Sequence, residues 1–109
     1  MSAYSLIVAI CPYGYANEVM NSARKAGATG GTILNSRSIG DEVKSKFMGI
    51  SLREEKEILI TLVTNEIRND ILQAIAQYSD DHPDREILTL AIPADNVVGI
   101  AKPIDSTLK

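Results

Sequence analysis

The chain has 109 residues, of which 45% are hydrophobic and 23% charged, and 14 acidic against 11 basic residues give a net charge of −3. This length predicts a single domain over residues 1–109. A general nucleic-acid binder needs a basic surplus to neutralise phosphates, so we expect no nucleic-acid partner. The single cysteine excludes an internal disulfide and a cysteine-rich zinc module.

The N-terminal residues carry no sign of a targeting segment. No charged region precedes the first apolar run, and the run from Leu6 to Cys11 is too short for the core of a secretion signal. No stretch approaches the roughly 18 apolar residues of a transmembrane helix. We therefore expect a cytoplasmic protein that does not insert directly into a membrane.

The first third of the chain predicts a strand, a helix and a second strand. The apolar run Tyr4–Cys11, closed by Pro12, is typical of a buried strand. A helical stripe follows and ends before Gly27, which is a usual stop signal. Residues 30–37 (GGTILNSR) predict the second strand. The stripe consists of four apolar residues at helical spacing: Ala16, Val19, Met20 and Ala23.

The second half repeats this order. Residues 57–63 (EILITLV) give the clearest strand, and Thr64 or Asn65 then caps a second helix. Residues 79–84 predict a polar turn, residues 87–92 a fourth strand, and residues 95–100 a short helix or strand. The apolar stripe of the second helix consists of Ile67, Ile71, Ala74, Ile75 and Tyr78.

A segment without periodicity, about residues 37–53, separates the two halves. A connection of this length in a small domain usually carries function. It has an apolar tip, which we predict to bind a partner protein; the alternative is that Phe47 folds back on its own domain. The tip consists of Lys46, Phe47, Met48 and Ile50.

The order of elements predicts an α+β, ferredoxin-like βαββαβ fold. Its antiparallel four-stranded sheet carries both helices on one face, with the long loop between strands 2 and 3. Successive residues of these strands point to opposite faces of the sheet, and both sets are apolar, which is typical of strands buried on both sides. Because 109 residues supply only one layer of helices, we expect the bare face to be covered by oligomerisation.

Residues 23–33 (ARKAGATGGTI) resemble the end of the first helix in the PII family of nitrogen-regulatory signalling proteins. The long loop lies where that family has its partner-binding T-loop, and Lys56 stands where its third strand begins with a lysine. Residues 92–100 (IPADNVVGI) are similar to the Pro-Val-x-x-Val ending of that family. The resemblance implies a homotrimer that binds an adenine nucleotide (ATP, ADP or AMP) or another small effector between subunits. It also implies regulation of an enzyme or membrane transporter through the loop.

The same resemblance implies the effector-binding residues. They are Gly30, Gly31, Thr32 and Lys56, with Lys102 close to the position of two family arginines. Glycines allow a close approach of backbone amides, and a lysine supplies a mobile charge. Residues 102–109 form a tail.

The sequence departs from that family at residues 79–86 (SDDHPDRE). The family has a glycine-rich run there that wraps the phosphates, whereas this chain has no glycine and four acidic residues, which would repel a triphosphate. The loop also lacks the tyrosine that some members modify, so we expect no uridylylation. The chain therefore resembles a divergent PII-like protein.

A second hypothesis is a metal-binding trimer of the CutA type. His82 stands among carboxylates, and imidazole with carboxylates suits Zn, Cu or Mn, although such a cluster is more commonly a hydrated turn. Cys11 reads as a small buried hydrophobe rather than a nucleophile, because the single histidine lies far away in the sequence. We expect no catalytic residues and no enzymatic activity. The carboxylates near His82 are Asp80, Asp81, Asp84 and Glu86.

Overall fold

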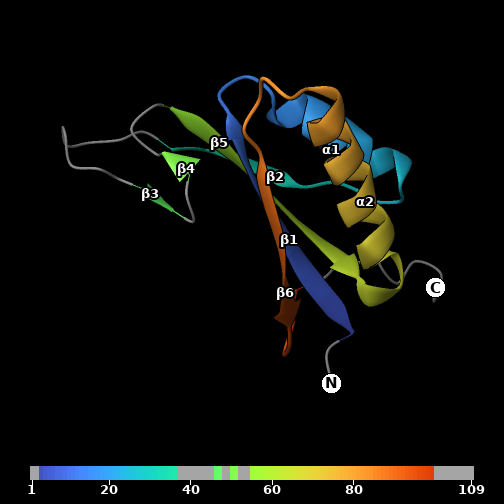
Figure 1. The fold of residues 1–109 in the computed structure, drawn as a ribbon. Coiled ribbons are helices and arrows are strands. Elements are labelled where there is room, and N and C mark those ends of the chain that lie inside the picture. Colours follow the sequence, from blue (N-terminus) through green and yellow to red (C-terminus); the bar gives the residue numbers. More distant parts are fainter. Residues whose placement is uncertain (1–2, 37–45, 48–49, 52–54, 100–109) are drawn as a thin grey trace.

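The computed structural model describes residues 3–36, 46–47, 50–51 and 55–99. Within them, four strands form one antiparallel sheet in the order β2-β5-β1-β6, and two helices lie side by side on one of its faces (Figure 1). The predicted ferredoxin-like βαββαβ class is confirmed. The strands are β1 (Tyr4–Pro12), β2 (Thr32–Ser36), β5 (Lys56–Thr64) and β6 (Leu88–Ala94), and the helices are α1 (Ala16–Lys25) and α2 (Asn65–Asp81).

The two central strands, β1 and β5, have nine residues each and come from the two clearest apolar runs. Val8 in β1 lies opposite Ile60 in β5 and opposite Leu90 in β6, so the three strands share one register. Both strands pair with a neighbour on each edge, and their unbroken apolar sequence directs apolar side chains toward both faces of the sheet.

Helix α1 ends in a Schellman motif. The backbone N–H of Ala28 donates to the carbonyl of Ala23, and that of Gly27 donates to the carbonyl of Arg24, both at 3.0 Å. Gly27 has a φ of +120°, a left-handed conformation that glycine adopts without a steric penalty. The predicted glycine stop signal is therefore confirmed.

Helix α2 begins after Thr64, whose backbone is extended, and runs to Asp81. The predicted turn over residues 79–84 was therefore wrong for its first three residues, Ser79–Asp81. The apolar stripe ends at Tyr78 because later positions no longer pack against the sheet. Their polar side chains can lie on the solvent side while the backbone continues the helical hydrogen bonds.

Three further predictions need correction. The second strand begins at Thr32 rather than residue 30, and residues 95–99 form neither a helix nor a strand, since Asn96 and Gly99 adopt positive φ. Lys46–Phe47 (β3) and Ile50–Ser51 (β4) pair as a small antiparallel hairpin within the predicted irregular loop. The remainder of that loop and the tail 102–109 lie outside the described residues.

The hydrophobic core lies between the sheet and the helices. Alternate residues of β1 and β5 point into it, and α1 and α2 contribute their apolar stripes. Neither helix of the described structure is long and apolar enough to cross a membrane. The core side chains that are at most 1% exposed include Ile7, Ala9, Val19, Leu59, Ile71 and Ile75.

Candidate functional site: the open sheet face and its two ends

The face of the sheet opposite the helices is apolar across all four strands. Its cross-strand neighbours form rows, and in two of these rows every side chain is aliphatic. On the outer strands, Leu34 is 46% exposed and Ile92 is 45% exposed. A contiguous exposed apolar surface of this kind marks an interaction site. The two rows are Leu34–Ile58–Ile10–Leu88, and Leu62–Leu6–Ile92.

Lys56 lies at the end of this open face where β5 begins, close to the long loop. It pairs with Pro12 on one side and Ser36 on the other, and it alternates with Ile58 and Ile60, so it belongs to the open face. Only 4% of the residue is exposed. Lysines are almost never buried to this extent without an anionic or polar partner. The structure therefore places Lys56 in an enclosed position.

Gly30, Gly31 and Thr32 lie at the other end of β2. Thr32 pairs with Ile60 and Ser36 pairs with Lys56, so four residues of strand, roughly 13 Å, separate Thr32 from Lys56. Thr32 is exposed and shares the open face with Lys56. The structure therefore places Thr32 and Lys56 on one face but not in one small pocket.

Gly31 is explained by packing within the chain. A Cβ atom there would lie 2.8 Å from the carbonyl oxygen of Ile60 and 3.2 Å from Sδ of Met20, so only glycine lets the chain enter β2 at this distance from β5. Gly30 has open space around it, and its carbonyl accepts a hydrogen bond from Oγ1 of Thr61 at 2.5 Å.

A polar cluster that the sequence did not reveal joins both helices to the turn before β6. Tyr78 Oη donates to Glu18 Oε1 at 2.6 Å, and Arg85 Nη1 donates to the same oxygen at 2.9 Å and to Tyr78 Oη at 2.5 Å. The Arg85 guanidinium also stacks on the ring of Tyr15, 3.8 Å from its centroid. We call these four residues the Arg85 cluster.

The electrostatics of the cluster follow from these contacts. The hydrogen bond from Tyr78, together with Arg85, lowers the pKa of Glu18 below its usual value of 4.5. Burial, followed by the interaction with Glu18, raises the pKa of Tyr78. Both shifts keep Glu18 charged and Tyr78 neutral, which is the combination that holds the turn against the helices.

His82 is occupied within its own chain. Its Nδ1 lies 2.9 Å from the carbonyl oxygen of Tyr78, and its ring lies 4.3 Å from the Tyr78 ring, centroid to centroid. Among the residues that the structure describes, no group of three or more histidine, cysteine, aspartate or glutamate side chains could hold a metal ion. The metal-binding hypothesis therefore gains no support from this turn.

Glu57 anchors the start of α1, another contact that the sequence did not reveal. Its Oε1 accepts a hydrogen bond from the backbone N–H of Ala16 at 2.9 Å, where a cap from Tyr15 is lacking. Cys11, which precedes Pro12 at the end of β1, is fully buried as expected. Burial, together with the Glu57 charge, raises the pKa of Cys11 to about 11, which disfavours the reactive thiolate.

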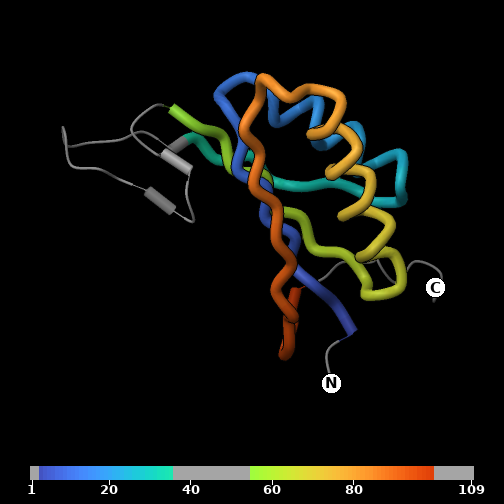
Figure 2. The backbone as a smooth tube through the Cα atoms, in the orientation of Figure 1, coloured from blue at the N-terminus to red at the C-terminus, as the bar shows by residue number. Residues whose placement is uncertain are grey.

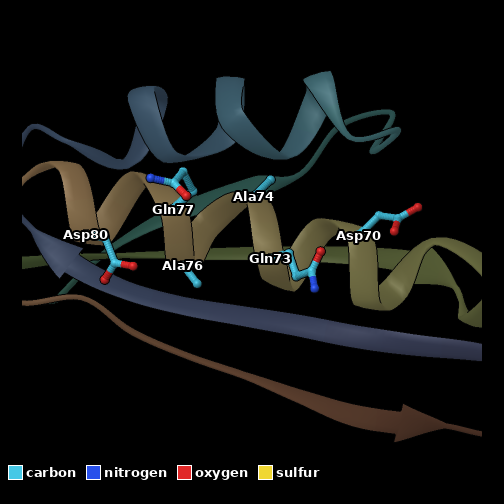
Figure 3. Close-up of a pocket in the computed structure, with 6 residues that line it drawn as sticks. All are labelled: Asp70, Gln73, Ala74, Ala76, Gln77 and Asp80. Atoms are coloured by element: carbon cyan, nitrogen blue, oxygen red, sulfur yellow. The ribbon is translucent and has the colours of Figure 1, made fainter.

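A hollow of about 490 Å³ lies along α2 (Figure 3). Its side chains point to different sides of the helix: Ala74 and Gln77 point toward α1 (Figure 3), whereas Gln73 and Asp80 are exposed and lie away from the buried stripe of α2. They do not converge on a common point, and none is a predicted site residue. We therefore assign no ligand to this surface.

Several predicted residues remain untested. Lys102 and Met48 lie outside the described residues. For Lys46, Phe47 and Ile50 the structure describes only the backbone, as the β3–β4 hairpin.

The fold has clear structural relatives. A Thermus thermophilus protein classed with PII-like signalling proteins has a TM-score of 0.61 at 17% identity, over 85% of this chain and 88% of that one. A DUF3240 family protein from Shewanella baltica has a TM-score of 0.65 at 13% identity, over 93% of this chain and 100% of that one. CPII from Thiomonas intermedia is a nitrogen regulatory PII-like protein whose structure holds ADP, AMP and bicarbonate. Its TM-score is 0.56 at 15% identity, over 87% of this chain and 96% of that one.

The chain has the PII-like fold. The predicted resemblance is thus confirmed in three dimensions, at low sequence identity. No protein-family model and no curated protein matches the sequence.

Proposed function

We propose that this chain is a divergent PII-like regulatory protein rather than an enzyme. Three copies associate through the open sheet face, and a small anionic effector binds between them near Lys56. Binding changes how the loop 37–53 engages a target, which is an enzyme or a membrane transporter in the cytoplasm. The loop residues Lys46, Phe47, Met48 and Ile50 form the target contact in this proposal.

The enclosed position of Lys56 is the observation that carries the proposal. It puts a cation at the base of the long loop and at the margin of the apolar face, with 4% of the residue exposed. Removing an ammonium group from water is costly unless an anion or several polar atoms replace the water. An anionic effector there would alter the segment that leads into the loop, because β5 begins with this residue.

The distance between Thr32 and Lys56 favours an adenine nucleotide. About 13 Å separates the two positions along β2, which a small anion cannot bridge. A nucleotide has a base at one end and phosphate at the other, so it can contact both. The adenine nucleotides and bicarbonate bound to CPII from Thiomonas intermedia fit the same chemical class.

Isothermal titration calorimetry of AMP, ADP and bicarbonate tests this function. We expect Lys56→Gln to weaken nucleotide binding by at least tenfold, since one charge-assisted contact is lost. Lys25→Gln, in the exposed last turn of α1, is the matched control and should bind like the wild type. Equal binding by wild type and Lys56→Gln would remove Lys56 from the site, and no binding of any of the three would reject the function.

A further inference from the structure

A second hollow, of about 440 Å³, lies between α2 and the beginning of β6. Figure 2 shows the chain leaving the end of α2, turning, and running back beside the helix as β6. Most of the lining is apolar. Its main residues are Leu72, Ile75 and Ala76 of α2, with Ile87, Leu88 and Thr89 at the start of the strand.

This hollow reaches the edge of the sheet. Thr89 pairs with Ala9, which is fully buried in the core, so its side chain faces the helices. Leu88 pairs with Ile10 and faces the opposite side. Because successive residues of a strand point to opposite faces, a hollow that both residues line extends over the edge of β6.

The edge has no pairing strand among the residues that the structure describes. In that part of the chain, β6 stands last in the strand order and pairs with β1 alone. Proteins usually protect such an edge with a charge, a proline, a bulge or a covering element. Residues 88–92 (LTLAI) contain neither a charge nor a proline, and their register with β1 is unbroken. The backbone of β6 can therefore accept a further strand.

We propose that this edge binds an extended, basic segment of a partner protein by strand addition. The backbone of the segment hydrogen-bonds to β6, and its alternate apolar side chains enter the hollow. Asp80 lines the hollow and is exposed, so it favours lysine or arginine in the segment. Arg85 in the nearby turn does not cancel this charge, because its guanidinium is paired with Glu18.

A second copy of this chain is less suited to the edge, because its own edge strands supply no cation. Neither Leu88–Ala94 nor Thr32–Ser36 contains a lysine or an arginine, and the chain has a net charge of −3. The inference goes beyond the proposed function, since it requires neither the effector nor the loop 37–53.

Titration of a blocked synthetic peptide, Lys-Lys-Val-Thr-Val-Thr-Val-Lys-Lys, into the isotope-labelled protein tests the proposal by NMR. At about 50 mM salt we expect a dissociation constant below about 1 mM, with the largest amide shifts in β6 and the second half of α2. Alternate amides of an added strand face β6, so N-methylation of either the valines or the threonines should abolish binding, and N-methylation of the other set should be tolerated. Glutamates in place of the lysines should weaken binding by about threefold or more.

Variants of α2 locate the binding. Ala76→Phe fills the hollow from an exposed position and should weaken binding by about fivefold or more. Gln73→Phe adds the same ring at an exposed position that does not line this hollow, and it should bind like the wild type. Asp80→Asn should weaken binding about twofold, whereas Asp70→Asn, its matched control, should not.

Three results would overturn the proposal. The first is no binding of the lysine peptide, and the second is binding that neither Ala76→Phe nor either N-methylation weakens. The third is a lower molar mass for Ala76→Phe than for the wild type, which would show that a second copy covers the hollow. None of these results decides whether a nucleotide binds near Lys56, so the proposed function is tested separately.

Discussion

The two faces of the sheet have nearly the same chemistry and different surroundings. On the helix-covered face, Ile7 and Leu59 are completely buried. On the opposite face, Val8 and Ile60 are their immediate neighbours in sequence and are equally aliphatic, yet they are only partly covered within one chain. Hydrophobic residues are ordinarily scattered singly on a surface rather than arranged in rows across a whole sheet.

This difference shows that the described part of one chain can cover only one face of its sheet. Two helices suffice to cover one face of a four-stranded sheet, and no described element covers the other. Burial of apolar surface contributes roughly 25 cal/mol per Å², so the open face has a strong tendency to associate. Lys56 lies at the margin of that face, so the proposed subunit interface and the proposed effector site would meet in one region.

The largest expected effect comes from a matched pair on β5, Leu59→Ala and Ile60→Ala. Leu59 is fully buried, so its truncation should lower the free energy of unfolding by about 2–5 kcal/mol at every protein concentration. Ile60→Ala should act mainly through association, so its cost should depend on protein concentration. Urea denaturation at two protein concentrations measures both. Equal, concentration-independent costs would contradict the difference between the faces.

A charge in the centre of the open face should break the assembly. Val8 is flanked by Ile60 and Leu90, so Val8→Asp would bury an unpaired carboxylate in any interface formed there. We expect a monomeric protein that retains the wild-type circular dichroism spectrum, whereas Val8→Thr, which keeps the branched shape, should still assemble. An assembled Val8→Asp protein would place the interface elsewhere.

The two adjacent glycines before β2 should respond differently to alanine. Gly31→Ala places a Cβ atom 2.8 Å from the Ile60 carbonyl oxygen, so we expect a loss of about 1–3 kcal/mol in stability. Gly30→Ala meets no atom within 4 Å and should be neutral or stabilising by up to about 1 kcal/mol. Thermal unfolding compares the two directly, and equal losses would contradict the packing role of Gly31.

The sequence predicted the fold better than the site, and particular residues show why. The runs over β1 and β5 and the Gly27 stop signal are local patterns, and each was correctly placed. The contact of Glu18 with Arg85 joins residues 67 positions apart, and the contact of Glu57 with Ala16 joins residues 41 apart. The periodic spacing of apolar residues does not indicate which residues far apart in the sequence are in contact. The packing role of Gly31 was not predicted, because a sequence cannot show that β5 lies against this residue.

A smaller effect is expected from Tyr78→Phe in the Arg85 cluster. It removes the hydroxyl that donates to Glu18 and accepts from Arg85, and a hydrogen bond of this kind contributes about 1 kcal/mol. Because the cluster holds the turn on the helix-covered side, the loss should not depend on protein concentration. Urea denaturation at two concentrations again gives the measurement, and a concentration-dependent loss would link the turn to the open face instead.

The smallest effect is a dependence on pH that comes from Glu18. Its pKa is lower in the folded chain than its usual 4.5, so its stabilising contribution is present above about pH 4.5 and is lost as the pH falls through the folded value. Glu18→Gln should therefore flatten part of the decrease in melting temperature between pH 5 and pH 3. An unchanged slope would mean that the contacts of Glu18 with Tyr78 and Arg85 do not stabilise the fold.

The molar mass of the wild-type protein in solution tests the role of the open face most directly. Size-exclusion chromatography with light scattering at tens of micromolar should give about three times the 11.8 kDa chain mass. A mass of 11.8 kDa at these protein concentrations would contradict the claim that the open face is a subunit interface. The apolar face would then remain exposed, and no cleft between subunits would exist.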